Sequence, residues 1–216
     1  AAVLLVRNDL NSKPRKQSIF VTGGSGGLGR ALALHHAQDG TEVSLWGRSS
    51  QRLFATKEAV EEAGGIASTT QFDLMDTQAA IELMLAQDEN ARFDCAYLVA
   101  GIGDTRAEGE MVESTQVILR AAQLNFAAPA AMAAALAERM AQRGGGRIVL
   151  IGSAAAHHSL PFAAAYSGSK SGLARFADAL RISMKPHGVS VTLASPGFID
   201  TEQDEQARQV VHSNCR

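Results

Sequence analysis

The sequence predicts an α/β fold, a three-layer doubly wound parallel sheet with helices on both faces. Short apolar runs alternate with longer amphipathic runs along most of the chain, which is typical of a parallel sheet covered by helices. A glycine-rich turn follows the first apolar run, and single polar residues follow several later ones. Because ligands of open α/β sheets bind at the carboxyl ends of the strands, we expect these residues to gather around one site.

Glycine and proline turns delimit the expected elements. Asp39-Gly40 stops the first helix, three consecutive glycines at 144–146 stop a long alanine-rich helix, and Pro186 with Gly188 stops the last one. The apolar runs predict strands at residues 18–22, 42–46, 67–72, 95–100, 147–151 and 189–194. The amphipathic runs predict helices at residues 28–38, 51–63, 77–88, 114–142 and 164–185.

The composition agrees with one globular domain. The chain has 216 residues, of which 46% are hydrophobic and 19% are charged, so it can bury a sizeable core. A net charge of -2 gives no general field for nucleic acid or for an anionic membrane. No signal peptide is recognisable, and no apolar run approaches the ~20 residues that a spanning helix needs. We therefore expect neither a nucleic-acid partner nor a membrane partner.

The cysteines and histidines predict no metal site. Cys95 and Cys215 have neither metal-ligand nor disulfide spacing, which favours a reducing compartment and hence a cytoplasmic protein. His35 and His36 lie on an expected helix without a third ligand at metal spacing.

A nucleotide cradle is predicted between the first strand and the first helix. Residues 22–29 read Thr-Gly-Gly-Ser-Gly-Gly-Leu-Gly, which is a Thr-Gly-x-x-x-Gly-x-Gly spacing. Because this segment follows a strand and opens a helix, its backbone N–H groups and the helix dipole can face a pyrophosphate. A lone glycine cluster is usually only a turn, so the prediction depends on this context.

The end of the second strand selects between the two nicotinamide nucleotides. A carboxylate there binds the ribose hydroxyls of NAD, whereas an arginine accommodates the 2′-phosphate of NADP. This chain has Gly47 where the acid is expected, followed by Arg48 and Ser49. We therefore expect NADP(H) rather than NAD(H); the alternative is that Arg48 is an ordinary solvated loop residue.

A proton-transfer pair is predicted on the last helix. Tyr166 and Lys170 are four residues apart, so they lie on one helix face, about 5–6 Å apart at Cβ. A free phenol titrates near pH ~10, and an ammonium beside it stabilises the phenolate and eases proton exchange at neutral pH. Ser153 stands thirteen residues before Tyr166, just beyond a strand. Outside this context each of the three is usually a surface or turn-capping residue.

Together these motifs resemble the short-chain dehydrogenase/reductase family over about residues 18–201, in the family's order and spacing. The resemblance implies a Rossmann-like fold and NAD(P)(H)-dependent interconversion of a ketone or aldehyde and an alcohol. It implies that Ser153 bonds the substrate oxygen, that Tyr166 gives or takes the proton, and that Lys170 bonds the nicotinamide ribose. Asn125 matches the family's asparagine that holds a water in a relay to the lysine.

The same resemblance implies the cofactor contacts. Asp73 with Leu74 would flank the adenine, and Ala100-Gly101 would pass the adenine ribose. The expected cofactor-binding residues are Gly23, Ser25, Gly26, Gly27, Leu28, Arg48, Ser49, Asp73, Leu74, Ala100, Gly101, Tyr166, Lys170, Pro196, Gly197, Ile199 and Thr201. Residues 18–216 would then be one NAD(P)-binding domain that includes the catalytic residues, preceded by an N-terminal extension of residues 1–17.

Two features depart from the family pattern. Leu98-Val99 stands where the family commonly has two asparagines, which suggests apolar packing instead of a polar brace. Only 15 residues follow Thr201, where family members continue through lid helices and a final strand. Either the lid and the last strand are shortened or residues are missing from this sequence.

The substrate region and the subunit contacts are less specified. His157 and His158 are either a second proton donor or solvated loop residues, and the latter fits better. Three apolar residues either line the pocket or pack in the core, namely Leu160, Phe162 and Phe198. The alanine stripe at 121–141 predicts a packing face. In the resembling family this helix and the Tyr/Lys helix often form a subunit interface, which implies a homodimer or homotetramer.

Three hypotheses for function follow. The first is an NADP(H)-dependent oxidoreductase acting on a small carbonyl or alcohol substrate. The second is a nucleotide-binding regulator or scaffold without turnover, and the third is a reductase module of a longer multifunctional chain. The intact Ser153, Tyr166, Lys170 and Asn125 set favours the first.

Overall fold

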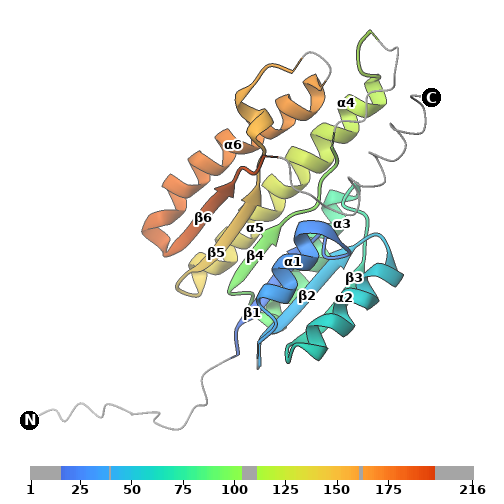
Figure 1. The fold of residues 1–216 in the computed structure, drawn as a ribbon. Coiled ribbons are helices and arrows are strands. Elements are labelled where there is room, and N and C mark those ends of the chain that lie inside the picture. Colours follow the sequence, from blue (N-terminus) through green and yellow to red (C-terminus); the bar gives the residue numbers. More distant parts are fainter. Residues whose placement is uncertain (1–15, 39, 104–110, 161–162, 198–216) are drawn as a thin grey trace, which may run out of the picture.

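A computed structural model describes residues 16–38, 40–103, 111–160 and 163–197, and it contains a six-stranded parallel sheet (Figure 1). The strands are β1 (Ser18–Thr22), β2 (Glu42–Gly47), β3 (Ile66–Gln71), β4 (Cys95–Leu98), β5 (Gly146–Ile151) and β6 (Val189–Ala194). The helices are α1 (Gly27–His35), α2 (Ser50–Glu62), α3 (Thr77–Ala91), α4 (Thr115–Ala122), α5 (Ala128–Gln142) and α6 (Ala164–Met184). Short helical turns are η1 (Gln123–Ala127), η2 (Ala154–His157) and η3 (Lys185–His187). The doubly wound α/β fold expected from the sequence is confirmed.

The sheet changes its winding direction between its two central strands. The strand order is β3-β2-β1-β4-β5-β6, so the chain moves outward from β1 to β3, then crosses back to β4 and moves outward the other way. Thr22 at the end of β1 lies opposite Trp46 of β2 and Leu98 of β4. The connections on either side of this point diverge, which opens a crevice at the carboxyl edge of the sheet.

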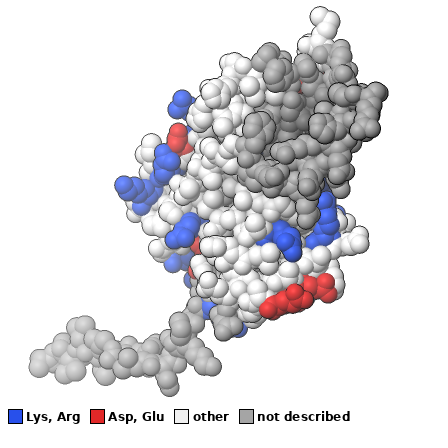
Figure 2. All heavy atoms as spheres, in the orientation of Figure 1, with Lys and Arg blue, Asp and Glu red and all other residues white. Residues whose placement is uncertain are grey.

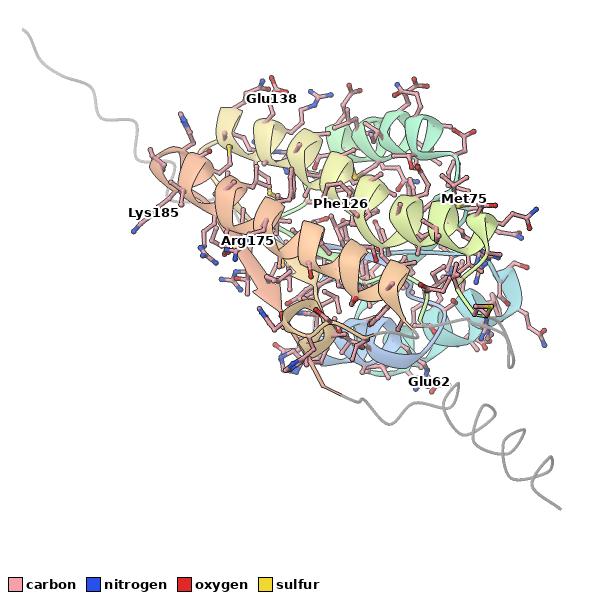
Figure 3. All side chains as sticks on the ribbon, turned by 90° about the horizontal axis from the view of Figure 1, so that it is seen from above. Glu62, Met75, Phe126, Glu138, Arg175 and Lys185 are labelled. Atoms are coloured by element: carbon pink, nitrogen blue, oxygen red, sulfur yellow. The ribbon has the colours of Figure 1, made fainter. Side chains whose placement is uncertain are left out.

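Two apolar cores cover the two faces of the sheet. Along β1, Ile19 and Val21 face α1 and α2, whereas Phe20 faces α3 and α5, because successive strand residues point to opposite faces. The ring of Phe20 packs edge-on against Trp46 at 5.2 Å and is stacked on Phe93 at 4.9 Å between ring centroids. The view along the layers shows α1 and α2 on one side of the sheet and α3, α5 and α6 on the other (Figure 3).

The helix from α4 to α5 is continuous but contains a wider turn. The sequence predicted one regular helix at 114–142, and the structure has α-helix, then a π-helical turn at η1, then α-helix again. A π turn accommodates one extra residue within a helix and is frequent at functional sites. η1 contains Asn125, whose side chain is fully buried.

The helix Thr115–Gln142 is also long and apolar enough to cross a membrane on length and composition alone, contrary to the expectation that no such run exists. It is 28 residues long with a mean hydropathy of 1.2 in its most apolar window. Its α5 part packs into the core through Met132, Leu136 and Met140, which is the behaviour of a core helix.

Charged side chains are dispersed over the face of the molecule that Figure 2 draws. On the face drawn in Figure 2, Lys and Arg side chains form small separate groups among uncharged residues, as do Asp and Glu side chains. No large surface of a single sign of charge is visible on this face.

Candidate active site

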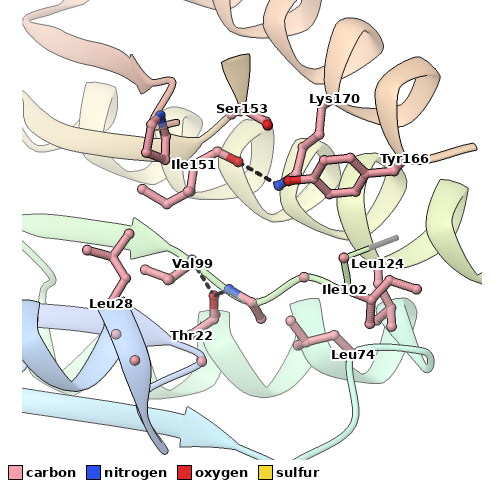
Figure 4. Close-up of a pocket in the computed structure, with 18 of the residues that line it drawn as sticks. Thr22, Leu28, Leu74, Val99, Ile102, Leu124, Ile151, Ser153, Tyr166 and Lys170 are labelled. Atoms are coloured by element: carbon pink, nitrogen blue, oxygen red, sulfur yellow. Dashed lines mark hydrogen bonds between the residues drawn. The ribbon is translucent and has the colours of Figure 1, made fainter. Parts of the chain in front are cut away.

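A cavity of about 830 Å³ opens at the carboxyl edge of the sheet, where the winding direction changes (Figure 4). The glycine turn after β1 and the ends of β2, β4 and β5 contribute to it, together with the first turns of α6. Of the residues predicted for the site, those that line it are Gly23, Ser25, Gly26, Gly27, Leu28, Arg48, Asp73, Leu74, Ala100, Gly101, Ser153, Tyr166, Lys170, Pro196 and Gly197. Ile199 and Thr201 lie outside the described residues.

The glycine turn is packed so closely that side chains are excluded from two of its positions. A Cβ on Gly29 would lie 2.2 Å from the carbonyl oxygen of Gly23. Gly23 has a φ of +70°, and a Cβ there would approach the backbone nitrogen of Ala100 to 3.1 Å. By contrast, a Cβ on Gly26 would meet no atom within 4 Å. The turn thus brings α1 against β1 and leaves open space before the uncapped N-terminus of α1, which suits a phosphate group.

Thr22 connects the glycine turn to the loop after β4. Its Oγ1 accepts hydrogen bonds from the backbone N–H groups of Val99 at 2.9 Å and Ala100 at 3.1 Å. Leu98 is 2% exposed in the core, and Val99 packs against the α1 side of the sheet. The apolar packing predicted for Leu98-Val99 is confirmed, and a threonine hydroxyl braces the backbone.

Lys170 is a buried amine at the wall of the cavity. Its Nζ donates to the backbone oxygen of Ile151 at 2.7 Å and lies 6.0 Å from the centroid of the Tyr166 ring. Burial removes the ammonium from water and lowers the pKa of Lys170 from 10.5 to about 8. Figure 4 shows Ser153, Tyr166 and Lys170 on the same wall of the cavity.

The depressed pKa of Lys170 predicts a pH-dependent stability. Between pH 8 and 10.5 the unfolded chain holds a proton on this lysine that the folded chain has lost, so the free energy of unfolding should rise with pH in this window. Below pH 8 the folded state carries a buried ammonium, at a cost on the order of 3 kcal/mol. Lys170→Met should remove this cost, so its stability advantage over the wild type should be largest near pH 7 and vanish near pH 10.5.

Denaturant unfolding of the two proteins without ligand, at a series of pH values, measures that difference. Lys57→Met is the matched control, because Lys57 is partly exposed and forms only a 3.7 Å pair with Glu61. A difference between wild type and Lys170→Met that does not change with pH would contradict the assignment.

Asn125 lies behind the cavity wall and does not line the cavity. Its Oδ1 accepts from the N–H of Ile102 at 2.8 Å, while its Nδ2 donates to the Ile102 oxygen at 3.0 Å and to Ser169 Oγ at 3.3 Å. Both amide protons are engaged, so a water could bond this side chain only through the second lone pair of Oδ1. A Cβ on Gly101 would lie 2.8 Å from Asn125 Oδ1 and 3.6 Å from Lys170 Nζ, so the chain passes between these two groups only as glycine.

Comparison with known proteins shows the family of this chain. Residues 17–211 match the family model described as short chain dehydrogenase. The chain belongs to the short-chain dehydrogenase family. An uncharacterised oxidoreductase of Myxococcus xanthus is 34% identical over 86% of this chain and 73% of its own length. A ketoacyl reductase of Nostoc is 32% identical over 85% of this chain and 63% of its own length.

A solved structure of another short-chain dehydrogenase, from Sphingobium yanoikuyae in complex with NADPH, superimposes with a TM-score of 0.79. It is 29% identical, and the alignment covers 89% of this chain and 75% of that one. The present chain thus spans between 63% and 75% of the length of these relatives.

In this short-chain dehydrogenase the structure also places residues in the cavity that sequence reasoning had not assigned to it. Arg52 lines it from the first turn of α2, whereas Arg48 precedes the N-cap Ser49, so no helical spacing relates the two arginines. His158, which the sequence left between a second proton donor and a solvated loop residue, is exposed and lines the cavity. Ile102 and Leu124 add apolar lining that no motif marks.

Ser49, predicted to bind the cofactor, has a structural partner instead. Ser49 does not line the cavity; its Oγ caps α2 by accepting from the N–H of Arg52 at 3.3 Å. Leu160 lines the cavity, whereas Phe162 and Phe198 lie outside the described residues.

Within the described part of the chain, no group of three or more His, Cys, Asp or Glu residues is arranged to hold a metal ion.

Proposed function

We propose that this chain is an NADP(H)-dependent oxidoreductase that interconverts a ketone or aldehyde and the corresponding alcohol. The observation that carries the proposal is the common cavity wall of Ser153, Tyr166 and Lys170, facing a glycine turn that leaves room for phosphates. When bound, the nicotinamide supplies or accepts the hydride. The glycine turn, Asp73-Leu74 and Ala100-Gly101 would hold the nucleotide, and the protein contributes position and electrostatics.

The proposed proton chemistry uses three side chains. Ser153 Oγ accepts a hydrogen bond from the N–H of Ala155 at 3.1 Å, which leaves its own O–H to donate to a substrate oxygen. Tyr166 would give that oxygen its proton during reduction and take it during oxidation. The Lys170 ammonium would stabilise the phenolate left behind and bond the nicotinamide ribose. Asn125 would act behind them by holding the loop at Ile102 and the second turn of α6 in place.

The preference for NADP(H) rests on the charges at the end of β2. Gly47 offers no carboxylate there, while Arg48 and Arg52 both line the cavity. The backbone of Arg48 is held by Gln71, whose Nε2 donates to the Arg48 oxygen at 3.1 Å. Guanidinium groups pair well with phosphate, and their charge gives no comparable benefit to a free ribose hydroxyl.

Arg48→Ala tests this preference. We expect the Kd for NADPH to rise by about tenfold or more and the Kd for NADH to change by less than about twofold, because only NADPH carries the 2′-phosphate. Fluorescence titration with both nucleotides in parallel measures the two constants. Arg181→Ala is the control, since Arg181 is half exposed and paired with Asp178 at 2.7 Å on α6. An equal rise in the Kd for NADPH and the Kd for NADH would contradict a role of Arg48 in specificity. A lower wild-type Kd for NADH than for NADPH would contradict the preference for NADP(H) itself.

Self-association is a further part of the proposal. Apolar side chains are exposed on α4, η1 and α6, among them Leu119 at 70%, Phe126 at 36% and Ile182 at 73%. Phe126 packs beside Gly172, so α6 approaches η1 closely and the two form one outer face. Such a face fits a second copy of the chain, in a homodimer or homotetramer whose molar mass light scattering would give. The cytoplasmic location expected from the composition stays a prediction.

A further inference from the structure

The first turn of α6 is bonded to a carboxylate from a distant part of the chain. Glu113 Oε2 accepts a hydrogen bond from the backbone N–H of Ala165 at 2.8 Å, across 52 residues of sequence. Glu113 lies two residues before the start of α4 and is only 7% exposed. Ala165 is the second residue of α6 and directly precedes Tyr166.

α6 provides no side-chain cap of its own. Ala163, at the N-cap position, makes no side-chain hydrogen bond, and the first turn contains no acidic residue. The first N–H groups of a helix lack partners within the helix, and the positive end of its dipole lies there. A carboxylate that accepts one of these N–H groups makes a charge-assisted bond and offsets the dipole. Glu113 therefore supplies to α6 the cap that α6 lacks.

The neighbouring residue performs the same task for a different helix. Ser114 Oγ accepts from the N–H of Val117 at 3.3 Å and so caps α4 locally. Glu113 reaches across to α6 instead, so two consecutive residues cap two helices. Burying a carboxylate is costly unless it is well bonded. The bond to the Ala165 N–H satisfies the Glu113 carboxylate and fixes the start of α4 relative to the start of α6.

A second contact holds α6 one turn further on. Ser169 Oγ donates to the backbone oxygen of Tyr166 at 2.8 Å and accepts from Asn125 Nδ2. Tyr166 therefore lies between an anchor at Ala165 and an anchor at Ser169. Ala163 and Tyr166 both line the cavity, so any shift of this first turn moves the cavity wall.

We propose that Glu113 is a positioning residue for Tyr166. Its carboxylate fixes the first turn of α6 and thereby the location of the Tyr166 phenol. This inference rests on the proposed function, in which Tyr166 transfers the proton. The phosphate cradle belongs to the turn between β1 and α1, so Glu113 should influence turnover and leave nucleotide binding unchanged. A displacement of about 1 Å at a reacting group can lower turnover by about 10²-fold.

Glu113→Gln and Glu113→Ala test the proposal, with Ser114→Ala as the matched control. Glutamine keeps an acceptor oxygen of the same reach, whereas alanine removes the cap. We expect kcat to fall by about tenfold or more in Glu113→Ala and by less in Glu113→Gln, with the Kd for NADPH within about twofold of wild type in both. Ser114→Ala should leave kcat within about twofold, because it caps only α4. If Glu113→Ala does not fold, the isosteric glutamine variant carries the comparison.

Backbone hydrogen exchange over residues 163–170 gives a readout that needs no substrate. We expect faster exchange of this segment in Glu113→Ala, an intermediate effect in Glu113→Gln and none in Ser114→Ala. Unchanged exchange in the alanine or glutamine variant would overturn the proposal, as would faster exchange with unchanged kcat. Wild-type protein that binds NADPH and reduces no carbonyl compound would refute the proposed function instead, and exchange alone would then decide whether Glu113 anchors α6.

Discussion

Replacing Tyr166 with phenylalanine is expected to lower turnover by about 10²- to 10⁴-fold, the range that a positioned acid–base group contributes. The ring that lines the cavity remains, so the Kd for NADPH should stay within about twofold of wild type. Steady-state reduction of a carbonyl substrate measures the first quantity, and nucleotide fluorescence titration measures the second. Loss of both together would mean that the phenol serves nucleotide binding rather than proton transfer.

The chain provides a matched control, because it has only two tyrosines. Tyr97 lies on β4 and packs against the α1 side of the sheet, where its hydroxyl makes a 2.7 Å hydrogen bond with His36 Nε2. Burial raises the pKa of Tyr97 to about 12. Tyr97→Phe should cost about 1 kcal/mol of stability and leave turnover unchanged. Equal turnover in Tyr166→Phe and Tyr97→Phe would rule out the proposed role of Tyr166.

The largest expected effect on stability comes from Asp88 at the end of α3. Asp88 is 1% exposed and accepts hydrogen bonds from Phe93 N at 2.9 Å and from Arg143 Nη2 at 2.9 Å. Arg143 also donates to the Phe93 oxygen at 2.6 Å, so this pair joins the turn before β4 to the end of α5. Asp88→Ala leaves the guanidinium charge without its carboxylate partner and the Phe93 N–H without its acceptor, and we expect the free energy of unfolding to fall by about 3 kcal/mol.

Denaturant unfolding checks this value against an exposed ion pair of the same type. Asp178 and Arg181 pair on the surface of α6, with their side chains 46% and 50% exposed. Asp178→Ala should change stability by less than about 0.5 kcal/mol, because exposed pairs contribute little. A loss below about 1 kcal/mol for Asp88→Ala would show that water replaces the carboxylate in the folded protein.

The sequence predicted the bounds of an element well where a glycine turn directly beside that element ends or begins it. The first strand was expected at 18–22 and is found there, because the glycine turn ends it within the same segment. The last strand was expected at 189–194 and is also found, after Gly188 with a φ of +75°. Glycine positions of this kind depend on the backbone alone, so they can be recognised without knowledge of the tertiary structure.

The predicted and observed ends of elements differ where contacts with residues far away in the sequence determine them. The fourth strand was expected to reach residue 100 but ends at Leu98, because the Thr22 hydroxyl takes the N–H groups of the next two residues. The third helix was expected to end at residue 88 but continues to Ala91, where Arg92 with a φ of 50° ends it and the Asp88–Arg143 pair secures the turn. Such contacts join residues some 50 to 80 positions apart, which periodicity does not encode.

In the candidate site, too, some residues could be predicted from the sequence and others could not. The glycine turn and the Ser153, Tyr166 and Lys170 set were predicted from spacing, and the structure brings them to one cavity. The contacts of Asn125 with Ile102 and Ser169 were not predicted, nor was the cap that Glu113 provides. These residues act through the backbone of other segments, so no motif in the sequence marks them.

The π turn at η1 makes the number of residues in this helix as important as their identity. Each residue of an α-helix advances the chain by about 100° around the axis, whereas the wider π turn takes one residue more for about the same rotation, so α4 and α5 stay in one continuous helix. Removing one residue from η1 would replace the wide turn by a regular one and shift the position of Asn125 on the helix. The buried amide of Asn125 could then no longer meet both Ile102 and Ser169. Single-residue deletions should therefore be far less tolerated between Gln123 and Ala127 than substitutions at exposed Phe126.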